Sequence, residues 1–167
     1  MLKPQDLLVM LKLSEDLPSW TFDSIAHELG LSSSSVHRSA QRAAEAGLYD
    51  YRRRRVNYPA LREFLVHGAR YVFPPRWHGE ARGLPTAWAA PPLADQLVWS
   101  ENNVPVWADA LGKARGIALE PLHEAVPDAA RQDDELWELL ALFDSIRVGA
   151  ARERKLAADE LERRLSK

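Results

Sequence analysis

A glycine turn between two short helical segments is the feature that most constrains the fold of this chain. Residues 23–29 place apolar side chains at helical spacing, and Gly30 follows at the position where a helix would end. Ser32 then stands where a side-chain oxygen caps the next helix, which we expect to continue to about residue 46 and to end at Gly47. The four consecutive serines therefore lie at the start of a helix rather than in a flexible linker.

Apolar residues recur at helical spacing elsewhere and indicate a mainly α-helical protein. The sequence predicts further helices over residues 4–13, 61–71, 133–146 and 151–165. The third of these is apolar enough to be buried on more than one side. This pattern favours either a dimer core or close contact with the rest of the chain.

A short basic hairpin is predicted directly after Gly47. Tyr49, Tyr51, Val56 and Tyr58 have strand character. The run Arg52–Arg55 lies between them, so we expect these arginines near the tip of the hairpin.

The charge of the chain is concentrated in this region. Residues 35–70 contain eight arginines and three acids, whereas residues 120–167 contain twelve acids and eight bases. The whole chain carries a formal charge of only −2. One basic segment in a near-neutral protein indicates an anionic partner for that segment.

The middle of the chain is rich in proline and tryptophan. Its tryptophans include Trp77, Trp88, Trp99 and Trp107. This composition is too aromatic for a plain linker, so we expect an irregular segment packed onto its neighbours, with one hairpin that joins residues 104–107 to 116–119. We therefore divide the chain into residues 1–72, 73–130 and 131–167.

The N-terminal segment resembles a winged helix-turn-helix over residues 2–65. That motif has a small residue where its helices cross, here Ala26, a glycine in the turn, here Gly30, and a β-branched residue six positions later, here Val36. The run LGLSSSSVHR followed by AGLY is similar to the corresponding stretch of MarR-like bacterial transcription regulators. The resemblance implies sequence-specific binding to double-stranded DNA and a role in transcription regulation.

The same resemblance implies that residues 33–42 form a recognition helix in the major groove. The expected DNA-binding residues are Ser33, Ser34, His37, Arg38, Gln41, Arg42, Arg52, Arg53, Arg54 and Arg55. Arg38 can donate two hydrogen bonds to guanine, and Gln41 can pair with adenine. The serines and Arg42 are better placed for phosphates, and the hairpin arginines for phosphates or a narrow minor groove.

Two departures from the family pattern shape further expectations. Ser39 stands where these regulators usually bury a larger aliphatic side chain, so this helix must pack closely or contribute less to the core. The motif also begins near residue 1, without the long N-terminal dimerisation helix of MarR proteins. We therefore expect a homodimer to be built from residues 131–167.

No sequence motif supports an enzyme. The chain has no GxGxxG, phosphate-binding GKS/T or GxSxG pattern, no cysteine, and no histidines at metal-ligand spacing. We expect no catalytic residues, no cofactor and no metal. No apolar run approaches the roughly 20 residues that span a membrane, and no signal peptide is recognisable, so we expect a cytoplasmic protein.

Two alternatives to a transcription regulator remain open. The first is an antitoxin-like or adaptor protein that binds a partner protein through residues 72–167 and also regulates its own operon. The second is a sensor whose tryptophan-rich segment forms a pocket for a small molecule.

Overall fold

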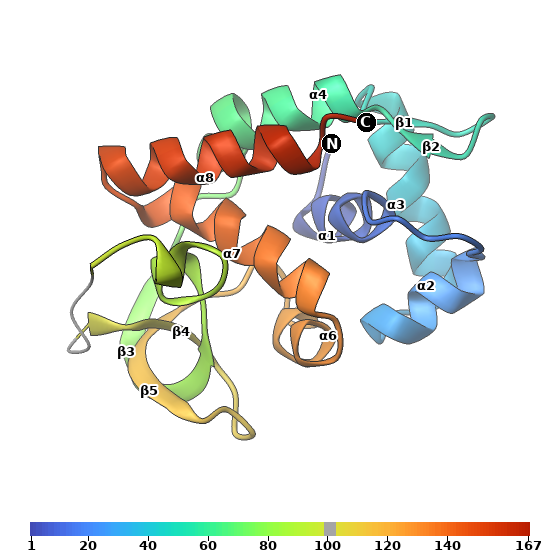
Figure 1. The fold of residues 1–167 in the computed structure, drawn as a ribbon. Coiled ribbons are helices and arrows are strands. Elements are labelled where there is room, and N and C mark those ends of the chain that lie inside the picture. Colours follow the sequence, from blue (N-terminus) through green and yellow to red (C-terminus); the bar gives the residue numbers. More distant parts are fainter. Residues whose placement is uncertain (99–102) are drawn as a thin grey trace.

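The computed structural model describes residues 1–98 and 103–167, and this part of the chain is mainly helical with two small sheets (Figure 1). The N-terminal elements are α1 (Pro4–Leu13), α2 (Phe22–Leu29), α3 (Ser33–Glu45), β1 (Tyr49–Asp50), β2 (Arg55–Val56), α4 (Tyr58–Glu63), a π-helical stretch (Phe64–Gly68) and α5 (Ala69–Val72). The helices predicted up to residue 71 are confirmed, with ends that differ by at most three residues.

Local capping explains where these helices begin and end. The side chain of Ser32 accepts a hydrogen bond from the backbone N–H of Ser35 and so caps α3, as the sequence indicates. Gly30 ends α2 with a φ of +66°, and Gly47 follows α3 with a φ of +80°. Tyr58 begins α4 rather than ending a strand, because the side chain of Asn57 caps that helix.

A small closed barrel replaces the irregular segment expected over residues 73–130. It consists of β3 (Trp77–Pro85), β4 (Pro105–Ala108) and β5 (Ala114–Leu119), followed along the chain by the C-terminal helices. Both β4 and β5 pair antiparallel with β3 and parallel with each other. The predicted hairpin is therefore wrong, although its two strands exist. Trp99, one of the tryptophans behind that expectation, lies outside the described residues.

Two glycines allow the barrel strands to approach closely. A Cβ atom at Gly83 would lie 1.9 Å from the backbone oxygen of Trp107, and one at Gly116 would lie 1.9 Å from the backbone oxygen of Val104. Any larger side chain at either position would have to displace backbone, so the tight curvature of this barrel requires glycine there.

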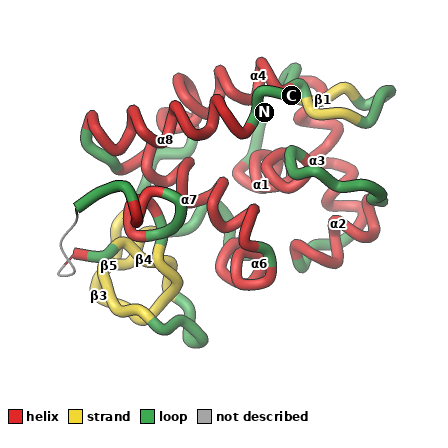
Figure 2. Tube along the Cα trace, viewed as in Figure 1, coloured by secondary structure: helices red, strands yellow, loops and turns green. Residues whose placement is uncertain are grey.

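Helix α7 lies at the centre of the molecule (Figure 2). The C-terminal helices are α6 (Val126–Gln132), α7 (Asp134–Val148) and α8 (Ala151–Arg164). Leu139 and Phe143 of α7 are 2% and 0% exposed, and they belong to one hydrophobic core that also includes α1 and Trp107. Close contact with the rest of the chain, one of the two options that the sequence left open, therefore accounts for the apolar character of α7. A dimer face built from this stripe is not available in the folded chain.

A buried carboxylate joins α7 to the barrel. One oxygen of Asp144 accepts hydrogen bonds from Thr86 Oγ1 at 2.7 Å and from Trp107 Nε1 at 2.8 Å. Its other oxygen binds the guanidinium of Arg147, which also donates to the backbone oxygens of Phe73 and Glu120. Because these groups come from two of the predicted segments, residues 73–130 and residues 131–167, those two segments pack against each other.

No helix in the described part of the chain is long and apolar enough to cross a membrane.

Candidate nucleic-acid interface

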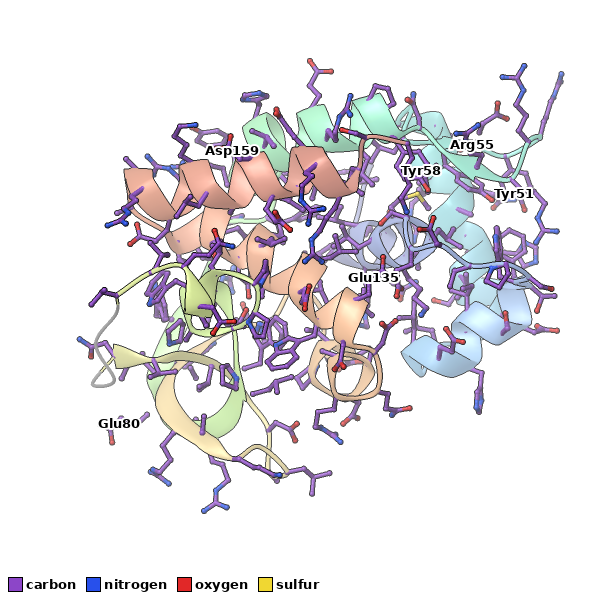
Figure 3. All side chains as sticks on the ribbon, viewed as in Figure 1. Tyr51, Arg55, Tyr58, Glu80, Glu135 and Asp159 are labelled. Atoms are coloured by element: carbon purple, nitrogen blue, oxygen red, sulfur yellow. The ribbon has the colours of Figure 1, made fainter. Side chains whose placement is uncertain are left out.

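The exposed face of α3 and the β1–β2 hairpin lie at one end of the molecule, away from the barrel (Figure 1). Ser34, His37, Arg38 and Gln41 are exposed on α3, and Arg52 to Arg55 are exposed in the hairpin. Figure 3 shows Tyr51 and Arg55 at this end. The structure thus brings the residues predicted from the helix and those predicted from the hairpin onto adjacent elements.

The opposite face of α3 is fixed on α1. Val36 and Ala40 are fully buried there. Gln5 Nε2 of α1 donates to Ser35 Oγ at 2.6 Å and to Ser39 Oγ at 2.9 Å. Ser39 is therefore a buried polar contact between the helices, which explains why this position carries no aliphatic side chain. These contacts set the orientation of the exposed face.

Arg42 belongs to this packing rather than to the exposed face. Its Nε and Nη2 atoms donate to the two carboxylate oxygens of Asp6, at 2.9 and 2.8 Å. Asp6 is fully buried and also accepts from the backbone N–H of Lys3 at 2.7 Å. This bidentate pair corrects the expectation that Arg42 is available to phosphates, because moving its guanidinium would leave a buried carboxylate unpaired.

The serine run is also used mainly within the protein. Ser33 Oγ donates to the carboxylate of Asp23 in α2, and Ser34 Oγ lies 3.3 Å from Ser32 Oγ. A carboxylate beside the first turn of α3 opposes a phosphate at that point, although it suits the positive end of the helix dipole. Among the serines expected to contact DNA, only Ser34 keeps an exposed side chain.

An aromatic cluster connects α3 to the hairpin, and the sequence analysis did not identify it as part of the site. The ring centroid of His37 lies 3.9 Å from that of Phe22, and His37 Nδ1 is 3.0 Å from Tyr51 Oη. The guanidinium carbon of Arg54 lies 4.4 Å from the ring centre of Trp20. The only sequence signal for this cluster is the aromatic side chains that flank the arginine run and begin α2.

The four hairpin arginines differ in their contacts with the rest of the protein. Arg54 has a φ of +52°, donates weakly to the backbone oxygen of Trp20 and stacks on its ring, so it orders the hairpin. Arg53 has a long ion pair of 3.8 Å with Asp50. Arg52 and Arg55, like Arg38 on α3, form no ion pair with the described residues and remain able to bind an external anion.

An ionic cluster around the buried Lys12 joins α1, α2 and the start of α7. Lys12 Nζ of α1 lies 2.8 Å from Glu28 of α2, 2.6 Å from Asp133 at the start of α7, and 3.1 Å from Glu15. Burial raises the pKa of Glu15 to about 8, and the hydrogen bond to Asp133 acts in the same direction. Burial thus favours the neutral form of Glu15. A lysine within an otherwise apolar helix is the only sequence signal for this cluster.

A cavity of about 410 Å³ lies behind the hairpin, not in the tryptophan-rich segment. Its lining includes Trp20, Tyr49, Arg55 and Tyr58. Trp107, by contrast, is 1% exposed and bonded to Asp144, so it forms part of the core. Within residues 1–98 and 103–167, no cluster of three or more histidines and acids has an arrangement that could hold a metal ion.

Comparison of the sequence with protein-family models and with curated proteins finds no match, and no solved structure matches the chain.

Proposed function

We propose that α2, α3 and the β1–β2 hairpin form a winged helix-turn-helix and that the protein binds double-stranded DNA in a sequence-specific manner as a transcription regulator. The observation that carries this proposal is the contrast between the two faces of α3. Buried contacts to α1 fix one face, whereas Arg38 and Gln41 on the other are exposed and have no partner in the described chain. Such a rigid helix with free bidentate donors suits recognition of base edges.

In this proposal the exposed side chains divide into two roles. Arg38, Gln41 and His37 contact base edges in the major groove, since recognition helices use their N-terminal part for this purpose. Arg52, Arg53 and Arg55 bind phosphates and supply binding strength that does not depend on sequence. Arg42 and Arg54 keep these residues in position through Asp6 and Trp20.

The test is selection of a preferred duplex from a random pool, followed by fluorescence anisotropy at two salt concentrations. We expect Arg38→Ala to weaken binding to the selected duplex by about 1–3 kcal/mol and to relax the preference for particular bases. Arg52→Ala should weaken binding to all duplexes and reduce the slope of log K against log salt by about 1.

Arg82→Ala is the matched control, because Arg82 is an exposed arginine on the distant barrel. This variant should leave both the affinity for the selected duplex and the slope of log K against log salt unchanged. Absence of duplex binding at low salt, or equal loss in Arg38→Ala and Arg82→Ala, would overturn the proposal.

A partner-binding function is the second candidate, and a feature of the barrel favours it. Arg82 of β3 and Arg115 of β5 are direct cross-strand partners, both are exposed, and neither pairs with a carboxylate of the described chain. Like charges in this position destabilise a sheet unless an anionic group lies between them. A protein partner that co-purifies with the wild type and is lost on Arg82→Glu, with DNA binding unchanged, would establish an adaptor or antitoxin-like role.

A further inference from the structure

His37 is held by two aromatic residues from different elements. Its ring lies on Phe22 of α2, with centroids 3.9 Å apart and planes inclined by 42°. Tyr51, which immediately follows β1, places its hydroxyl oxygen 3.0 Å from Nδ1 of His37 and stacks on Phe22 with ring centroids 6.2 Å apart. An exposed histidine would otherwise change rotamer freely, so these contacts restrict it to one orientation.

The direction of the hydrogen bond with Tyr51 sets whether the other ring nitrogen of His37 donates or accepts. Nε2 of His37 has no partner in the described residues. The tyrosine hydroxyl can rotate and donate to Nδ1, and a neutral ring then carries its proton on Nε2. A protonated ring also donates from Nε2. When Tyr51 donates, or when the ring is protonated, Nε2 presents a hydrogen-bond donor to a partner of the protein; when Nδ1–H donates to Tyr51 instead, Nε2 is an acceptor.

We propose, on the basis of the DNA-binding function above, that Tyr51 is a positioning residue that makes His37 a reader of purines. Nε2–H of His37 donates to N7 of a purine in the major groove. N7 is the acceptor that adenine and guanine share, so the expected preference at this base pair is for either purine over a pyrimidine. His37 is the fifth residue of α3, in the part of a recognition helix that approaches base edges.

The decisive variant is Tyr51→Phe, which keeps the aromatic ring and removes only the hydroxyl. We expect about 3- to 10-fold weaker binding to the selected duplex, as for loss of one hydrogen bond, and a reduced purine preference at one position. The slope of log K against log salt should not change, because no phosphate contact is lost. Tyr71→Phe is the matched control, since Tyr71 is 72% exposed on α5.

A double-mutant cycle separates positioning from a direct contact. In a His37→Ala background, Tyr51→Phe should have no further effect on DNA binding. Replacement of the contacted purine by its 7-deaza analogue, which lacks N7, should weaken the wild type and leave His37→Ala unaffected. Thermal unfolding of each variant shows whether a loss of binding reflects a loss of folding.

Three results would overturn the inference while leaving the proposed function intact. Tyr51→Phe could bind like the wild type, it could lose affinity equally for all duplexes, or the wild type could be insensitive to 7-deaza substitution. If the wild type itself binds no duplex at low salt, the proposed function fails, and the role of Tyr51 fails with it.

Discussion

Replacement of Glu15 by glutamine tests the ionic cluster under the interface. Glu15 is 7% exposed, and its carboxyl group lies between Lys12 and Asp133. Glutamine has nearly the same shape and keeps a hydrogen-bond donor toward Asp133, but it cannot ionise. The variant therefore removes the proton equilibrium of this site with little change in packing.

The sign and size of the effect follow from the raised pKa of Glu15. In the unfolded chain the group has an ordinary value of 4.5, and in the folded protein burial raises its pKa to about 8. Between these values the folded state holds more protons than the unfolded state, so rising pH lowers the free energy of unfolding by about 1.4 kcal/mol per pH unit. The contribution is fully present below pH 4.5, decreases as pH rises to 8 and is lost above it.

Urea denaturation at pH 5, 6.5 and 8 measures this dependence. We expect the stability of Glu15→Gln to fall less than that of the wild type over this range. The stability difference between the variant and the wild type should therefore shift by about 3 kcal/mol in favour of the variant between pH 5 and pH 8. Glu28→Gln is the control, because Glu28 contacts the same lysine but is half exposed, and its effect should stay below about 1 kcal/mol. A Glu15→Gln variant that is less stable at pH 8 would show that Glu15 is ionised and paired with Lys12, and would refute the reasoning.

Substitutions at three further positions test the packing by chemical denaturation. Asp144→Ala removes the carboxylate partner of the buried guanidinium of Arg147, leaves the indole N–H of Trp107 unpaired and should cost about 3–5 kcal/mol, whereas Asp144→Asn should cost less. Arg42→Met should cost about 3 kcal/mol, because it isolates the buried carboxylate of Asp6; a loss below about 1 kcal/mol would contradict the importance of this ion pair. Gly83→Ala should destabilise the protein by about 3 kcal/mol or more through its clash with the backbone of the facing strand, and an unchanged unfolding midpoint would contradict the barrel geometry.

Short-range signals account for the parts of the fold that the sequence predicts correctly. Gly30 and Ser32 specify the end of α2 and the start of α3 through one backbone conformation and one capping bond. The apolar spacing of α1 and α7 likewise depends only on residues within a few turns. These features need no knowledge of distant residues, and for this reason they can be recognised in the sequence.

The barrel could not be predicted in this way. Its strands are far apart in the sequence, and β3 pairs with both of the others. Glycine is required at positions 83 and 116 because the backbone of Trp107 in β4 and of Val104 just before β4 lies too close for a Cβ atom. Sequence neighbours of Gly83 and Gly116 carry no sign of that backbone. The region was therefore interpreted as irregular from its proline and tryptophan content, although Trp77, Pro105 and Trp107 lie in strands of the barrel.

For the candidate interface, local periodicity in the sequence was enough to place Ser34, His37, Arg38 and Gln41 on the outer face of α3, and the sequence order placed the arginines at the hairpin tip. Only the tertiary structure decided which of the residues expected to contact DNA are free. Arg42 pairs with Asp6, Ser33 pairs with Asp23, and His37 is held by Tyr51. A charged or hydroxyl side chain binds whichever partner the fold brings within about 3 Å, and that partner lies on another element of the chain.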